Sequence, residues 1–141
     1  MTPLPSPPTR MLLKILAGCF ILFMLLIVAI ANRGEGGHWW SFIHGIPYGD
    51  KLGHVCLMGT LCLLCNLALT PRRFAFLPAF ITRVTFVLLV IVTLEELSQA
   101  FITTRSCNPL DWLADLAGLA LGQMAATALR NRFSKTIPDN S

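Results

Sequence analysis

Long apolar runs, separated by short polar stretches, dominate the chain. Four such runs reach roughly the 20 residues that an α-helix needs to cross a hydrocarbon core of about 30 Å. Helices are the only spanning structure open to them, because isolated strands would leave backbone polar groups without partners in lipid. The predicted spans are residues 11–31, 52–70, 77–102 and 109–129.

The two ends of the chain are polar. Residues 1–10 hold four prolines and no apolar period, which predicts a disordered tail. Residues 131–141 form a second polar tail. Residues 29–31 read Ala-Ile-Ala, as a secretory cleavage site would, but the apolar run over 15–31 exceeds the usual signal core of about 7–15 residues. The sequence therefore favours a retained first span over a signal peptide.

Composition supports a membrane protein. Only 13% of the 141 residues are charged and the mean hydropathy is +0.67, whereas a soluble domain carries about 25% charged residues. The formal net charge of +4 does not indicate nucleic acid, because the basic residues flank the apolar runs. Most of them fall on the side that holds both termini and the 71–83 loop. By the positive-inside rule we expect an all-α, four-helix bundle with both termini in the cytoplasm.

The five cysteines do not predict a disulfide framework. Their number is odd, and four of them lie inside apolar stretches. Cys62 and Cys65 form a CxxC pattern within an apolar helix, where cysteine packs as a small hydrophobic residue. The sequence predicts neither a metal nor a cofactor.

Acidic residues gather on the opposite side, where six of the seven fall. Glu95 lies 22 residues after Arg73, about 33 Å along a helix, so it and Glu96 stand at the outer hydrocarbon edge. Ionisable groups at such depth usually face a bundle interior and have partners there. Helical spacing supplies same-helix neighbours: Glu95 and Glu96 with Gln99, Asp50 with His54, and Asp111 with Asp115.

The fourth span continues its acidic stripe with small residues. Gly118 and Gly122 follow Asp115 at helical spacing and would let another helix approach closely. We expect this packing to bring the acids of the fourth span against Glu96 and His54. Arg105, on the loop before, is the expected counter-charge. The predicted polar site is Asp50, Lys51, His54, Glu95, Glu96, Gln99, Arg105, Asp111 and Asp115.

Capping residues predict where the fourth span begins, and two histidines are not counted in the polar site. Asn108 is a capping residue, followed by a proline at the first helical position and Asp111 in the first turn. His38 and His44 stand in a glycine-rich loop and are expected to be solvated.

Several of these residues follow a family pattern. Residues 50–54 read Asp-Lys-Leu-Gly-His, and residues 96–99 read Glu-Leu-Ser-Gln, with Arg105 six residues later and Asp111 six beyond that. In order and spacing this resembles the VanZ-like family of small bacterial membrane proteins. The match covers residues 47–125. The family often has Asn where this chain has Asp115, so this chain carries one more acid.

The resemblance implies a multi-pass protein of the bacterial inner membrane. The family takes its name from a protein linked to resistance to the glycopeptide teicoplanin. A site at the outer face would then bind or modulate a cell-envelope lipid or a wall-related molecule, with the lipid bilayer as surroundings and no nucleic acid as partner.

Two other functions remain open from the residues. An intramembrane enzyme would use Glu96 as general base with His54 as partner, although residues 95–100 lack the Arg of the E-E-x-x-x-R pattern of CAAX-type glutamate proteases. A divalent metal held by Asp50, His54, Glu96 and Asp111 is chemically conceivable. A regulatory subunit would instead meet a partner, or a second copy, through Gly118 and Gly122.

Overall fold

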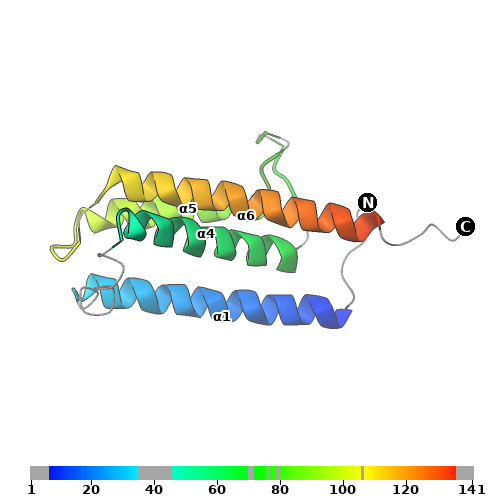
Figure 1. Ribbon diagram of the computed structural model, residues 1–141, viewed down its shortest axis with the longest axis horizontal. Coiled ribbons are helices and arrows are strands. Elements are labelled where there is room, and N and C mark those ends of the chain that lie inside the picture. The colour runs from blue at the N-terminus through cyan, green and yellow to red at the C-terminus, as the bar shows by residue number, and fades with distance from the viewer. Residues whose placement is uncertain are drawn as a thin grey trace, which may run out of the picture.

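The chain folds into four α-helices in the computed structural model. The structure describes residues 7–34, 46–69, 72–75, 77–78, 80–105 and 107–135, and within them it contains helices and no strand. The helices run side by side, and the start of α1 and the end of α6 lie at the same end (Figure 1). Their bounds are Pro7–Asn32 for α1, Gly49–Ala68 for α4, Arg83–Gln99 for α5 and Pro109–Lys135 for α6.

Three of the helices, α1, α4 and α6, are long and apolar enough to cross a membrane. The predicted boundaries differ from the helices by a few residues: α4 is Gly49–Ala68 instead of 52–70, and α5 ends at Gln99 instead of 102. Three differences are larger. Helix α1 already begins at Pro7, inside the segment predicted to be disordered, and α6 continues to Lys135, beyond its predicted end. Helix α5 begins only at Arg83, although the third span was predicted from residue 77.

The late start of α5 has a local cause. The side chain of Thr82 accepts a hydrogen bond from the backbone N–H of Thr85 at 3.2 Å, as an N-cap does. Pro78 lies just before it, and a proline within a helix removes a backbone donor. Hydropathy extended the predicted helix through these residues, whereas the cap fixes its true beginning.

Helices α4 and α6 cross at unusually close range through glycines. A Cβ atom on Gly118 would lie 2.6 Å from the carbonyl oxygen of Val55, and one on Gly122 would overlap the carbonyl oxygen of Gly59. The close approach predicted for this stripe therefore occurs, and the approaching helix is α4 of the same chain. An oligomer through this stripe would have to replace α4.

Helix α1 packs on α4 in a separate apolar layer. Ala17 of α1 is buried with Leu61, Cys65 and Ala68 of α4. Most other large side chains of α1 are exposed, as a lipid-facing helix requires. Cys62 and Cys65 are both buried and free. Cys65 packs in this apolar layer, whereas Cys62 Sγ also accepts from Asn66 Nδ2 at 3.3 Å and lies 3.4 Å from Thr85 Oγ1.

Neutral polar side chains are buried where α4 ends and α5 begins. Asn66 is 1% exposed, its Oδ1 accepts from Thr82 Oγ1 at 2.7 Å, and its Nδ2 donates to Thr85 Oγ1 at 3.0 Å. Gln123 of α6 accepts from the backbone N–H of Thr82 at 3.1 Å. We call this group the neutral network; it comprises Cys62, Asn66, Thr82, Thr85 and Gln123.

Arg130 of α6 closes the same end of α4. Its Nη2 donates to the carbonyl oxygens of Asn66 and Leu69, the latter at 2.7 Å. The last carbonyls of a helix lack partners within the helix, and a cation placed there also meets the negative end of the helix dipole. One guanidinium thus joins the ends of two helices.

Candidate functional site

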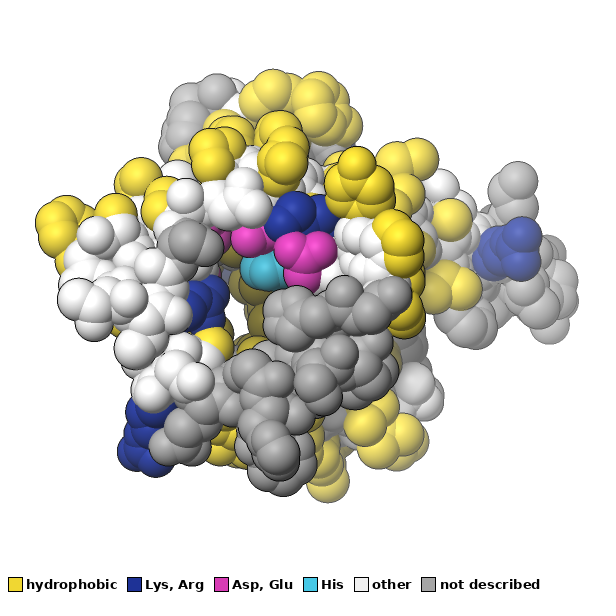
Figure 2. All heavy atoms as spheres, turned by 60° about the vertical axis from the view of Figure 1, so that its left-hand side comes forward, with side chains coloured by type: hydrophobic (Ala, Val, Ile, Leu, Met, Phe, Trp, Pro, Cys, Tyr) yellow, Lys and Arg dark blue, Asp and Glu magenta, His cyan; other side chains and the backbone are white. Residues whose placement is uncertain are grey.

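The predicted polar residues gather at the opposite end of the bundle. The start of α4, the end of α5 and the start of α6 meet there (Figure 1). Seen toward this end, acidic, histidine and basic side chains lie together among apolar ones (Figure 2). We call the nine predicted residues the charged cluster.

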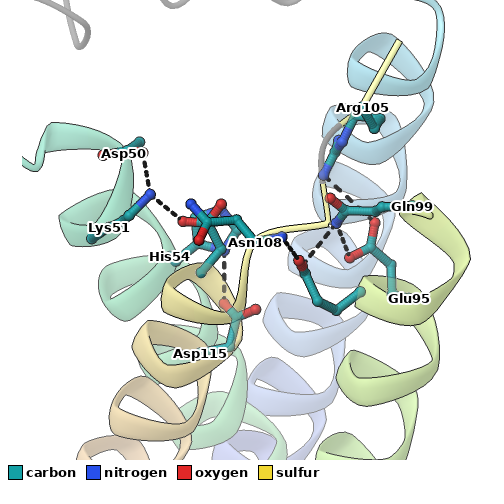
Figure 3. A network of polar contacts seen from close by, with 10 residues as sticks. Asp50, Lys51, His54, Glu95, Gln99, Arg105, Asn108 and Asp115 are labelled. Carbon is teal, nitrogen blue, oxygen red and sulfur yellow. Dashed lines mark hydrogen bonds and ion pairs between the residues drawn. The ribbon is translucent and has the colours of Figure 1, made fainter. Parts of the chain in front are cut away.

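The start of α6 sets the position of its two acids. Asn108 Oδ1 accepts from the backbone N–H of Leu110 at 3.1 Å, so Asn108 caps the helix as predicted. Asp111 then stands in the first turn, where a carboxylate interacts favourably with the helix dipole. Asp115, one turn further, points toward α4 (Figure 3).

Lys51 lies between two carboxylates. Its Nζ is 2.6 Å from Asp50 Oδ2 and 2.6 Å from Asp111 Oδ1 (Figure 3). The lysine side chain is 21% exposed and that of Asp111 is 18% exposed, whereas that of Asp50 is 48% exposed. The ammonium group therefore joins α4 to α6, and Asp50 keeps an open side toward solvent.

His54 and Asp115 form a second link between the same helices. The Nδ1–H of His54 donates to Asp115 Oδ1 at 2.9 Å (Figure 3). The side chain of Asp115 is 1% exposed and that of His54 is 30% exposed. Within the described part of the chain, His54 Nε2 makes no hydrogen bond. A buried carboxylate thus orients a ring whose other nitrogen stays available.

The two glutamates of α5 bind the loop that follows. Glu96 is buried; its Oε1 accepts from the backbone N–H of Asn108 at 2.8 Å and its Oε2 accepts from Gln99 at 3.0 Å. Gln99 also donates to Glu95 at 3.0 Å. Arg105 stands 3.8 Å from Glu95 (Figure 3). These contacts fold the α5–α6 connection onto the end of the bundle.

The structure shows how the expected partners pair. Asp115 meets His54, as predicted. Glu96 makes its hydrogen bonds to Gln99 and to a backbone amide, and it lies close enough to Asp111 and His54 to interact with both electrostatically. Arg105 is a counter-charge, as predicted, and its ion-pair partner is Glu95 of α5 at 3.8 Å. Asp50 turns to Lys51 and not to its helical neighbour His54, because an ammonium group forms the stronger, charge-assisted bond.

The metal set considered from the sequence is not assembled. Among the residues that the structure describes, no three or more His, Cys, Asp or Glu side chains are placed to share a metal ion. The reason is visible in the geometry: the Lys51 ammonium group stands between Asp50 and Asp111, where a cation would have to sit. Glu35, His38 and His44 lie outside the described residues.

Two polar contacts near the cluster were missed from the sequence. Trp112 Nε1 donates to Thr93 Oγ1 at 3.0 Å, and Thr93 donates in turn to the carbonyl oxygen of Leu89 at 2.8 Å. The signal was available, because a tryptophan in the first turn of α6 needs a partner for its N–H when it turns inward. The backbone N–H of Asn108 gave no such signal, since side-chain patterns do not reveal loop amides.

Fold and site together define a helical membrane protein that carries a charged cluster at one end of its bundle. Comparison of the chain with family models, curated proteins and solved structures finds no match.

Proposed function

We propose that the chain is a VanZ-like protein of the bacterial inner membrane with four spans and both termini in the cytoplasm. Its charged cluster then faces the outer side and binds the headgroup of a cell-envelope lipid or a wall-related molecule. Support comes from the placement of five acids, one histidine and two basic residues at a single end of the bundle, among apolar side chains. Such groups in a membrane protein usually mark a functional site.

The observation that carries the proposal is which groups stay available to a ligand. Lys51 is occupied by two carboxylates, and Glu96 and Asp115 are buried in their own hydrogen bonds. Glu95 and Arg105 are 28% and 19% exposed and form an ion pair with each other at 3.8 Å. The most exposed acceptors outside that pair are the carboxylate of Asp50 and the Nε2 of His54. Both accept hydrogen bonds when the histidine is neutral, so the cluster favours a headgroup that donates them, such as a primary amine.

Exposed apolar side chains surround the cluster. Tyr48, just before α4, is 78% exposed, Phe101 after α5 is 89% exposed, and Leu110 at the start of α6 is 56% exposed. Aromatic residues prefer the boundary between hydrocarbon and headgroups. An amphiphile can therefore keep its acyl chains against these side chains while its headgroup meets the cluster.

A matched pair of lipids tests this. The unfolding temperature of the purified protein is measured with added phosphatidylethanolamine, which has N–H donors, and with phosphatidylcholine, which has none. We expect greater stabilisation by phosphatidylethanolamine, lost in Asp50→Asn/His54→Phe and kept in Arg72→Gln at the opposite end. Equal stabilisation by both lipids would refute amine recognition. Teicoplanin is tested in the same assay, to determine whether a glycopeptide binds the charged cluster instead of a lipid.

The orientation is tested separately. Cys107 is exposed at the cluster end of the bundle and is free. We expect an impermeant thiol reagent to label it in intact cells, with Cys107→Ser as the unlabelled control. Labelling only after the cells are opened would place the cluster in the cytoplasm and would end the envelope proposal.

A second candidate function rests on the pair His54 and Asp115. A buried carboxylate that holds Nδ1–H leaves Nε2 to take a proton from water, which is how a general base acts. The alternative is an intramembrane hydrolase with His54 as base, oriented by Asp115 and not by Glu96. Turnover of an ester-linked lipid by the wild type, lost in His54→Gln while the lipid still binds, would distinguish it from simple binding.

A further inference from the structure

One flank of the bundle is apolar over a much shorter height than the other. On α1 the uncharged stretch from Lys14 to Arg33 covers about 28 Å, whereas on α5 the stretch from Arg83 to Glu95 covers only about 18 Å. Helix α5 as a whole has 17 residues, about 26 Å. A hydrocarbon core is about 30 Å thick. The α5 flank therefore falls well short of the bilayer that α1 matches.

The basic residue at the start of α5 is held in place. The backbone N–H of Arg83 donates to the carbonyl oxygen of Arg72 at 2.8 Å, and its Nε donates to that of Arg73 at 3.0 Å. Its guanidinium group lies 4.7 Å from the centre of the Phe74 ring, within the range of a cation–π contact. The backbone bond fixes the start of the helix, and the two side-chain contacts oppose the extension by which a long basic side chain usually reaches the headgroups.

Helix α5 is also fixed along its axis. The neutral network ties Thr82 to Asn66 of α4 and to Gln123 of α6, at the level of α5's first turn. At the other end the buried carboxylate of Glu96 holds the backbone N–H of Asn108. The helix cannot slide toward either surface without breaking buried hydrogen bonds, so its position relative to α4 and α6 is set.

Between these fixed ends, α5 presents an apolar surface. Val87, Val90, Ile91 and Leu94 are each between 42% and 61% exposed, and Leu97, in the last turn of α5, continues the strip at 56% exposed. In a membrane such a strip contacts lipid acyl chains, and its length along the membrane normal determines which hydrocarbon thickness matches it. A bilayer accommodates a short apolar stretch mainly by becoming thinner beside it.

We infer that the bilayer is thinner beside α5 than beside α1, and that this flank favours lipids with short acyl chains. Headgroups on the cluster side then lie at the level of Glu95, next to the charged cluster. A headgroup can then reach the charged cluster sideways, from the lipid layer beside α5; this step rests on the proposed function. The thinning itself does not depend on any ligand.

Chain length provides the test. The full chain is reconstituted in phosphatidylcholine vesicles with dimyristoleoyl, dioleoyl or dierucoyl chains, and its unfolding temperature is measured. We expect the highest value in the short-chain vesicles. Arg83→Leu removes the charge at which the apolar stretch of α5 begins. We expect it to shift the highest unfolding temperature to vesicles with longer acyl chains, whereas Arg10→Leu on α1 leaves the preferred chain length unchanged. An optimum in dierucoyl vesicles, or no shift with Arg83→Leu, would overturn the inference.

A depth measurement covers the case in which Arg83→Leu does not fold. A spin label is placed at Val90, midway along α5, or at Leu22, midway along α1, after the exposed Cys19, Cys56 and Cys107 are replaced by alanine. We expect the label on α5 to collide more often with a water-soluble relaxation agent. Equal depth would contradict the thinning. If the depths differ while phosphatidylethanolamine and phosphatidylcholine stabilise equally, only the proposed ligand is refuted.

Discussion

The charged cluster and the neutral network lie at opposite ends of the same three helices and satisfy their polar groups in different ways. In the network, amide and hydroxyl groups are paired inside the bundle, and Asn66, Thr82 and Thr85 are all less than 10% exposed. In the cluster, ion pairs leave Asp50 and His54 partly open. The network therefore has the features of a structural clamp, whereas the cluster has those of a site.

The difference has an energetic reason. A neutral hydrogen bond in a buried place contributes about 0.5–1.5 kcal/mol and leaves no charge behind. A buried ion pair roughly offsets its own desolvation, so it is weak as a clamp, and its partly exposed groups stay free to interact. Substitutions in the network should therefore change folding, and substitutions in the cluster should change binding.

The largest effect is expected where α4 and α6 cross, between the two regions. Gly122→Ala places a Cβ on the carbonyl oxygen of Gly59 and 2.9 Å from Cys62 Cβ. We expect the free energy of unfolding to fall by about 3 kcal/mol or more, at the upper end for overpacked interiors. Gly53→Ala is the control, because nothing lies within 4 Å of its Cβ. Equal stability of the two variants in a denaturant titration would contradict the close crossing.

Asn66→Leu tests the clamp. It removes the acceptor of Thr82 and a donor to Thr85 in a fully buried position. We expect a loss of about 2–3 kcal/mol of unfolding free energy, the cost of leaving buried polar groups unpaired. Thr60→Leu, on the exposed side of the same helix, should be nearly neutral. Preferential stabilisation by phosphatidylethanolamine should persist in Asn66→Leu, and its loss would show that the network shares the site.

Asp115→Asn tests the site. The amide oxygen of asparagine can still accept from His54. We expect a stability change of about 1 kcal/mol or less, since one hydrogen bond is weakened and none is removed. The same variant should lower the affinity for phosphatidylethanolamine about tenfold, or about 1.4 kcal/mol, as read by lipid titration. Failure of this variant to fold would assign Asp115 to the clamp instead.

The smallest effect is expected at Arg105. Its ion pair with Glu95 is 3.8 Å long and partly exposed, and such pairs contribute between about 0 and 1 kcal/mol. Arg105→Gln should therefore change the free energy of unfolding by less than Asp115→Asn does. A larger loss in the same thermal assay would mean that the loop contributes more to the bundle than its contacts suggest.

Hydropathy located all four helices but misplaced the start of α5. The apolar residues before Arg83 resemble helix in composition, whereas Thr82 decides the boundary through its side-chain oxygen. The glycine stripe was more informative, because Gly118 and Gly122 at helical spacing do mark the closest helix crossing. The sequence placed the acids of the fourth span against both His54 and Glu96, and so did not decide between α4 and α5 as the helix that meets the glycines.

The sequence predicted that the residues of the charged cluster lie together, but not all of their hydrogen-bond partners. Helical spacing correctly joined Gln99 to both glutamates, because same-helix geometry is fixed by the backbone. Partners of Glu96 were missed because a backbone amide in a loop leaves no mark in the sequence. The buried hydrogen bonds of Asn66 and Gln123 were not predicted either, although a polar residue inside an apolar span usually has a hydrogen-bond partner within the bundle.

The bonds of Arg130 to the end of α4 have a consequence for how the protein is made. Both the His54–Asp115 bond and the Arg130–Leu69 bond join residues 61 positions apart. The ribosome synthesises α4 before α6. Until α6 has been synthesised, His54, Gly59 and the carbonyl oxygens of Asn66 and Leu69 therefore lack the α6 residues that they contact in the folded bundle. The bundle therefore closes late, and a chain interrupted after α5 would leave α4 in the bilayer without the helix that completes it.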